Sequence, residues 1–152
     1  MSRFTREETD DYGLVRTAIE HLSLTLAIQR ITKEELEALK ENVRNLEREI
    51  KNGNTRNIVK YESEFHEIIY NATKSHVIRE TMSGLNTKFL WIRAVTLTVR
   101  GAARECLAEH KKLLNAIMKR NVGQAKRIVN QHLKHGGEKL YNLPWLFKDT
   151  RM

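Results

Sequence analysis

The sequence predicts an all-α protein, a single antiparallel bundle of about six to seven helices, because apolar residues recur at intervals of three and four along most of the chain. Its length of 152 residues suits one hydrophobic core. Hydrophobic residues make up 40% of the chain, too many for a disordered protein, and 7 glycines and 1 proline are too few for a many-stranded β fold. We expect an N-terminal segment at residues 1–11, the bundle at residues 12–139 and a C-terminal tail at residues 140–152.

Three helices are expected in the first half of the chain. The first covers residues 11–29, where apolar side chains fall on one face. Thr32 followed by Glu35 has the spacing of a capping box, so the second helix begins there, and Gly53 ends it. The third helix covers residues 55–71. The inward stripes of the first two helices are Val15, Ile19, Leu22 and Leu26, then Leu36, Leu39, Val43, Leu46 and Ile50.

The second half contains more glycine and therefore more expected breaks. Ser75 is the cap of a helix that starts at His76 and breaks at Ser83-Gly84, after which another helix covers residues 85–99. Gly101 precedes a helix over residues 103–120.

The last helix has signals at both ends. Asn121 is its expected cap, and Gly136-Gly137 its expected end. In the tail, Trp145 and Phe147 are expected to hold the chain against the bundle.

Charge and composition limit the function. The net charge of +8 is uneven: residues 1–76 hold 12 Lys/Arg and 14 Asp/Glu, giving −2, and residues 77–152 hold 15 and 5, giving +10. Direct nucleic-acid binding by the basic half would need a stripe of cations on one helix. The cations are instead dispersed in outer-face pairs, at Lys111, Lys112, Lys119, Arg120, Lys126 and Arg127. We therefore expect no nucleic-acid contact by this half.

The expected cellular location and the residue types available for a metal site follow from the absence of long apolar runs and of further cysteines. No apolar run is long enough to span a membrane and no signal segment opens the chain, so we expect a soluble cytoplasmic protein that makes no membrane contact. Cys106 is the single cysteine. An internal disulfide or a multi-cysteine metal cluster is thereby excluded, and any metal site must use histidine and carboxylate.

Ionisable side chains interrupt the apolar stripes of three helices. On a helical wheel of about 100° per residue, Glu62 lies about 40° and His66 about 80° from Ile58. His110 and His132 each lie about 20° from the centre of an inward stripe. Buried polar groups are costly unless they are bonded, and three histidines with one carboxylate suit zinc or nickel first, then manganese or iron.

A second interpretation of these residues needs no metal. A core-facing histidine is often satisfied by a hydrogen bond to a neighbour, and a glutamate at the edge of a stripe often reaches water. His21 and His135 lie off the inward stripes and are not expected to take part.

Five short motifs also follow one another in the order and spacing of a known family. They are Arg16 and Glu20 in R-x-x-x-E, the helix entry Thr32 to Leu39, Glu62-Ser63-Glu64-Phe65-His66 for D-x-x-F-H, the pair Glu109-His110, and Asn121, Ala125, His132 and Leu133 at the end. Over residues 12–137 the chain resembles the effector-binding C-terminal (FCD) domain of GntR-type transcriptional regulators, a relative of the FadR C-terminal domain.

The resemblance implies a homodimeric sensor in which a divalent metal helps to bind a small organic acid. Carried over by position, the metal ligands are Glu62, His66, His110 and His132, with Glu62 where the family has Asp. In the family a winged-helix DNA-binding domain precedes the bundle, and the effector alters its affinity for DNA. That domain is absent from this chain, so we expect DNA contact only through it.

The effector carboxylate needs a fixed cation, and arginine offers a two-pronged donor. Arg93 and Thr96 lie about 80° and 20° from Leu85 on the helix expected over residues 85–99, so Arg93 is the first candidate, with Thr96 beside it and Arg16 second. A surface salt bridge is the alternative role for both arginines.

A metal-dependent enzyme using the same histidines and glutamate is the alternative function. We expect a non-enzyme, because Glu109 is the one spare acid near the stripes and points about 100° away from His110.

Overall fold

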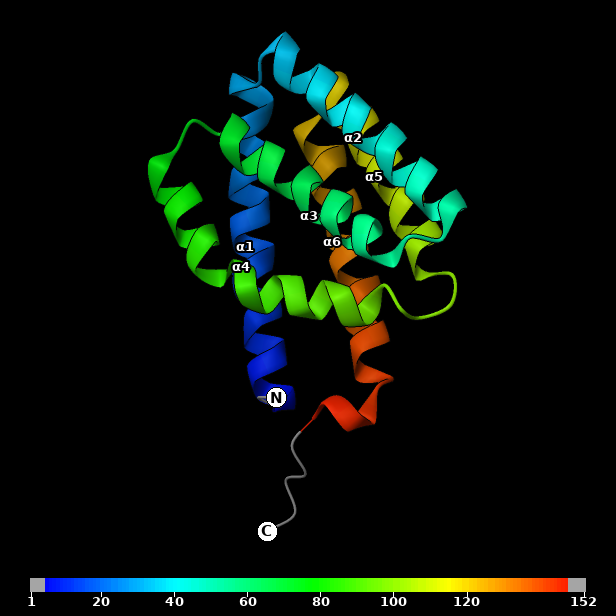
Figure 1. The fold of residues 1–152 in the computed structure, drawn as a ribbon. Coiled ribbons are helices and arrows are strands. Elements are labelled where there is room, and N and C mark those ends of the chain that lie inside the picture. The colour runs from blue at the N-terminus through cyan, green and yellow to red at the C-terminus, as the bar shows by residue number, and fades with distance from the viewer. Residues whose placement is uncertain (1–4, 148–152) are drawn as a thin grey trace.

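A computed structural model describes residues 5–147, and helices build the fold across that range (Figure 1). They are α1 (Arg6–Arg30), α2 (Lys33–Asn52), α3 (Thr55–Ala72), α4 (His76–Thr96), α5 (Ala102–Met118), α6 (Val122–Tyr141) and a short 3₁₀ helix, η1 (Pro144–Leu146). The all-α bundle predicted from the sequence is confirmed. Among the described residues, no helix combines the length and the apolar character that crossing a bilayer would require.

Long antiparallel neighbours form the frame of the bundle. α1 and α6 run beside each other, and α2 packs on α3 and α5 (Figure 1). The main core lies between α1, α2, α3, α5 and α6, where Leu24, Leu39, Phe65, Leu113 and Val129 are almost completely buried. Two smaller clusters form around α4, one against α3 and α1 and the other against the end of α6 and η1. The space between these clusters is where the polar site lies.

Side-chain caps set most of the helix starts. Thr32, Asn54, Ser75 and Asn121 each accept a hydrogen bond from the backbone N–H three residues later. The starts predicted at Thr32, Ser75 and Asn121 are therefore confirmed. Gly53 ends α2 at φ +68°, a left-handed conformation that glycine adopts without strain.

Three predicted boundaries are wrong. α1 begins at Arg6 and not near residue 11, because Thr5 and Glu8 form a complete capping box. α4 is one helix through Ser83-Gly84, although it bends along its length before it passes across α6 (Figure 1). α6 continues through Gly136-Gly137 to Tyr141. Packing of neighbouring turns overrides the low helix propensity of glycine at both places.

The tail is held by apolar contacts, as expected, but by only one of the two predicted aromatics. Leu146 and Phe147 are buried, and the guanidinium of Arg6 lies 4.5 Å from the Phe147 ring centroid. Trp145 is 55% exposed. The part of the tail beyond Phe147 lies outside the described residues.

Candidate metal centre and ligand pocket

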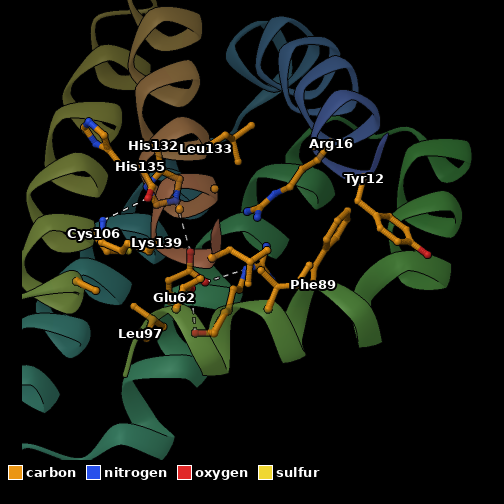
Figure 2. A pocket seen from close by; sticks show the side chains of 18 of the residues that line it. Tyr12, Arg16, Glu62, Phe89, Leu97, Cys106, His132, Leu133, His135 and Lys139 are labelled. Atoms are coloured by element: carbon orange, nitrogen blue, oxygen red, sulfur yellow. Dashed lines mark hydrogen bonds and ion pairs between the residues drawn. The ribbon is translucent and has the colours of Figure 1, made fainter. Parts of the chain in front are cut away.

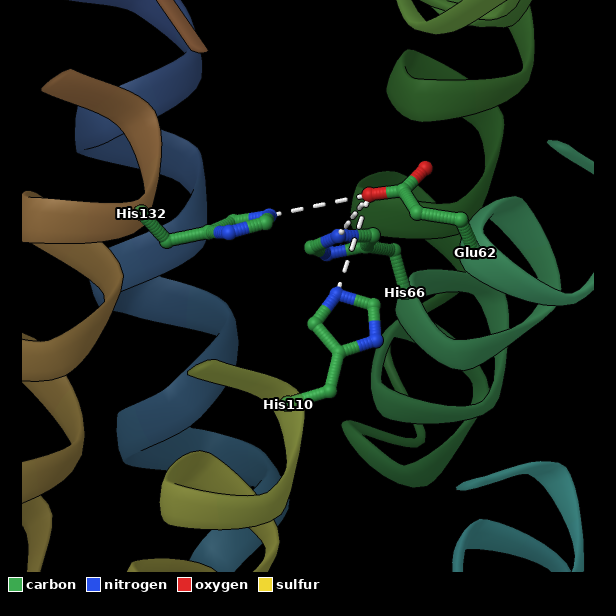
Figure 3. A group of neighbouring side chains, drawn as sticks. All are labelled: Glu62, His66, His110 and His132. Carbon is green, nitrogen blue, oxygen red and sulfur yellow. Dashed lines mark hydrogen bonds and ion pairs between the residues drawn. The ribbon is translucent and has the colours of Figure 1, made fainter. Parts of the chain in front are cut away.

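Three imidazoles converge on a single carboxylate oxygen in the middle of the bundle. The Nε2 atoms of His66, His132 and His110 lie 3.0, 3.6 and 3.7 Å from Oε1 of Glu62 (Figure 3). The His66 and His110 side chains are fully buried, and those of Glu62 and His132 nearly so. The four residues predicted from the helical wheels therefore meet at one point.

Three helices supply these side chains. α3 carries Glu62 and His66 one turn apart, so both side chains leave the same face of that helix. α5 carries His110 and α6 carries His132, and both helices pack together. The ring of His110 also stacks on Phe65, with centroids 4.1 Å apart and planes inclined by 17°.

The donor atoms are spaced as a metal ion requires. One ligand atom from each of the four residues lies within 4.8 Å of all the others. Zinc binds nitrogen and oxygen at about 2.0–2.1 Å, so neighbouring ligands of a tetrahedral ion lie about 3.3 Å apart. The separations of 3.0 to 3.7 Å from Glu62 Oε1 bracket that value. Glu62, His66, His110 and His132 can thus hold a metal ion.

The protonation states of Glu62 and His110 favour metal binding, whereas bonding to Glu109 and Glu62 outweighs burial and raises the pKa of His132, which favours its protonated form. Burial opposes the charge of Glu62, but Arg93 and the three histidines outweigh it and hold the pKa of this carboxyl well below its usual range. Nε of Arg93 lies 2.9 Å from Oε2 of Glu62. Burial, together with the charges of His132 and His66, lowers the pKa of His110 to about 3, so His110 is neutral at pH 7.

A second carboxylate orients His132 from the opposite side. Nδ1 of His132 lies 2.6 Å from Oε2 of Glu109, whose other oxygen lies 3.0 Å from Nδ1 of His135. Burial raises the pKa of Glu109, but these histidines outweigh it and lower the pKa to about 2. Glu105 also lies 2.9 Å from His135 Nδ1 and 2.9 Å from Lys139 Nζ.

A similar arrangement lies behind His66. Its Nδ1 atom faces Oε1 of Glu20 at 3.6 Å, beyond hydrogen-bond distance, and Glu20 accepts a hydrogen bond from the hydroxyl of Tyr70. Glu20 is fully buried, and His66, Arg16 and Tyr70 outweigh that burial and lower its pKa to about 2. Two of the three histidines therefore have an acid at the nitrogen that faces away from Glu62.

A pocket of about 120 Å³ opens beside this cluster, between α1, α4 and α6 (Figure 2). All three predicted effector residues, Arg16, Arg93 and Thr96, line it together with Glu62 and His132. Arg93 and Thr96 are buried. The side chain of Arg16 is 12% exposed, and its guanidinium lies 3.6 Å from Glu20. Neither arginine forms the surface salt bridge that was the alternative.

Four residues around the cluster have contacts that the sequence did not predict: Glu20, Tyr70, Glu109 and His135. Glu20 entered only as part of a motif, Glu109 only as a spare acid, and Tyr70 not at all. His135, set aside because it lies off the inward stripe, lines the pocket and bonds to Glu109. Glutamates on the flanks of apolar stripes, close to buried histidines, were the available signal.

Comparisons with known proteins agree with this fold. The sequence profile of the FCD domain matches residues 13–135. The chain is 25% identical over 141 residues to YdhC of Bacillus subtilis strain 168, described as an uncharacterized HTH-type transcriptional regulator. That match covers 92% of this chain and 63% of YdhC.

A solved structure has the same fold. E. coli McbR/YncC superimposes with a TM-score of 0.81 at 18% identity, over 90% of this chain and 66% of that one. The chain thus spans about two thirds of the length of either protein. Because the profile covers most of the bundle, the chain belongs to the FCD domain family.

Proposed function

We propose that this chain is the effector-sensing domain of a GntR-type transcriptional regulator, with a divalent transition metal held by Glu62, His66, His110 and His132. The observation that carries the proposal is the convergence of three Nε2 atoms on one oxygen of Glu62. Zinc or nickel fits this donor set best, and manganese or iron is the alternative. When bound, the metal supplies a localised positive charge that attracts a carboxylate.

The residues of the pocket would bind the effector, a small organic acid. Arg16 and Arg93 contribute cationic N–H donors on two sides of the pocket, and Thr96 lies beside Arg93. The hydroxyl of Thr96 donates to the backbone oxygen of Arg93 at 3.3 Å, which helps to fix that turn of α4. Glu62 balances Arg93 and holds it at the edge of the pocket.

Signal transmission would run through α1. This helix contributes Arg16 to the pocket and also packs against α3 and α6, which carry three of the four cluster residues. An effector that prefers one placement of α1 would shift the equilibrium of a winged-helix domain joined to its N-terminal side. DNA contact is assigned to that domain, in keeping with the HTH-type description of YdhC.

We also propose that the domain works as a homodimer. Three large apolar side chains of α1 are exposed, with Leu14 at 71%, Leu22 at 51% and Val15 at 46%, although Val15 and Leu22 were expected in the inward stripe of this helix. Exposed apolar side chains of this size are costly in water unless a partner covers them. Analytical ultracentrifugation should give a dimer for the wild type and a monomer for Leu14→Glu/Leu22→Glu; a wild-type monomer would contradict the proposal.

An enzymatic role is less well supported. Glu109, the acid that a hydrolytic mechanism would use as a base, is already bonded to His132 and His135. Thermal shift assays with a panel of small carboxylic acids, with and without chelator, test the sensor function. Stabilisation that needs the metal is expected, whereas turnover of any acid would support the enzyme.

A further inference from the structure

The ligand pocket has a charged end and an apolar body. Arg16, Arg93 and Glu62 supply the charged end, and Figure 2 shows Arg16 and Glu62 among the lining side chains. Apolar side chains form another part of the wall, next to the polar residues His132, His135 and Lys139. They are Phe89, Ile92, Leu97, Ala102, Leu133 and Leu140. A pocket with a charged part and an apolar part binds some classes of organic acid better than others. The proposed function does not say which class is bound.

The charged end has spare donors for an anion. Nε and Nη2 of Arg16 are buried and find no hydrogen-bond partner among the described residues, although Nε lies 3.6 Å from Oε1 of Glu20. The guanidinium lies 5.2 Å from the centroid of the Phe89 ring, which fixes its plane. Buried N–H groups without partners are costly, and the planar fork of arginine matches the two oxygens of one carboxylate.

Other polar side chains that line the pocket are already engaged. His135 and Glu109 are bonded to each other, and Lys139 is bonded to Glu105. The hydroxyl of Thr96 donates within its own helix. A ligand hydroxyl buried in the pocket would therefore lose water without gaining a partner, and each buried hydroxyl would weaken binding about tenfold.

The size of the cavity sets the size of the ligand. A cavity of about 150 Å³ accommodates a benzene molecule, and this pocket, at about 120 Å³, is of the same order and also opens to solvent.

We propose that the effector is a monocarboxylate with an unsubstituted apolar body of about four to seven carbons, and not a polyhydroxylated or polycarboxylic acid. This inference rests on the proposed function, because it assigns the ligand of the same pocket. Its carboxylate lies at the Arg16 and Arg93 end, and its apolar body lies against Phe89, Leu97 and Leu133.

Calorimetric titration of the zinc-loaded full chain tests the ligand class. Acetate, butanoate, hexanoate and benzoate form the apolar series, and gluconate and citrate are the polar acids. Affinity should rise about fourfold for each methylene that the pocket buries. Hexanoate and benzoate should bind at least tenfold more tightly than gluconate. A flat series, or tighter binding of gluconate or citrate, would overturn the inference.

Two variants locate the apolar body. Leu97 lines the pocket but lies in none of the buried core clusters, so Leu97→Asn should weaken hexanoate binding about tenfold and leave acetate binding and zinc content unchanged. Leu90→Asn is the control, because Leu90 lies on α4, which ends one residue before Leu97, and is 41% exposed outside this pocket. Equal hexanoate affinity in both variants would overturn the placement.

Zinc content separates the two proposals. Wild-type protein that holds zinc and prefers gluconate or citrate would overturn only the ligand class. Protein that holds no zinc and binds none of the acids would overturn the proposed function together with this inference. Cys106 provides an independent readout, since it is the single cysteine and lines the pocket. Hexanoate should slow its reaction with a thiol reagent, and gluconate should not.

Discussion

Nδ1 of His132 lies 2.6 Å from Oε2 of Glu109, while the Nε2 atom of the same ring faces Glu62 at 3.6 Å. A carboxylate bonded to the far nitrogen of a histidine fixes the orientation of its ring and increases its strength as a metal ligand. Glu109 thereby connects α5 to the α6 ligand. We assign it a positioning role.

Glu109→Gln is expected to lower metal affinity by about 10- to 100-fold, because the amide leaves the orientation of His132 less well fixed. Competition against a chromogenic chelator at pH 7 measures this affinity. Glu105→Gln is the control, since Glu105 contacts His135 and Lys139. Affinities that match in the two variants would show that Glu109 does not position His132.

Arg93→Met is expected to destabilise the metal-free protein by about 3–5 kcal/mol, because it leaves the buried charge of Glu62 without its nearest cation. Added zinc should recover part of this loss by supplying positive charge. Urea unfolding with and without zinc measures both free energies.

The control for Arg93 is Arg44→Met, which removes an exposed pair with Glu41 and should change stability by less than about 1 kcal/mol. If Arg93→Met behaved like this control, the pair between Arg93 and Glu62 would contribute nothing to the fold.

Gly84→Ala is expected to stabilise the protein by about 0.4–1 kcal/mol, since Gly84 lies inside α4, has ordinary helical φ and leaves room for a methyl group. Gly53→Ala should instead cost about 1 kcal/mol, because φ at Gly53 is +68°. Thermal unfolding of both variants measures the difference. A destabilised Gly84→Ala protein would favour the helix break that the sequence suggested.

Helical periodicity was enough to place the four cluster residues, because each lies on or beside a stripe that the core must bury. Glu62, His66, His110 and His132 meet although 43 residues separate His66 from His110 (110 − 66 − 1). Periodicity works here because the helix geometry is regular and the apolar faces must all point to one interior.

Contacts between side chains of different helices could not be predicted from the sequence. Glu109 was expected to point away from His110 and to be a spare acid, but α6 brings His132 and His135 to meet it. Glu20 and Tyr70 meet across α1 and α3 in the same way. A wheel describes one helix at a time, so partners that depend on the packing of two helices do not appear in it.

The helix ends predicted at glycines were wrong in two places, again because packing between helices does not appear in the sequence of one helix. Gly84 and Gly136-Gly137 lower helix propensity locally, yet the residues on both sides pack against the bundle, and that packing keeps α4 and α6 continuous. Gly53 was identified correctly, because there the chain adopts the left-handed conformation that glycine favours.

The most direct test of the account is the metal content of protein purified without an affinity tag, measured by elemental analysis for wild type, His110→Ala and His76→Ala. His76 is the matched control, because its side chain is 82% exposed and its ion-pair partner is Glu80, which is not part of the cluster. Circular dichroism confirms that each variant is folded. We predict stoichiometric metal in wild type and His76→Ala and its loss in His110→Ala; wild-type protein without stoichiometric metal, or His110→Ala protein that retains it, would contradict the account.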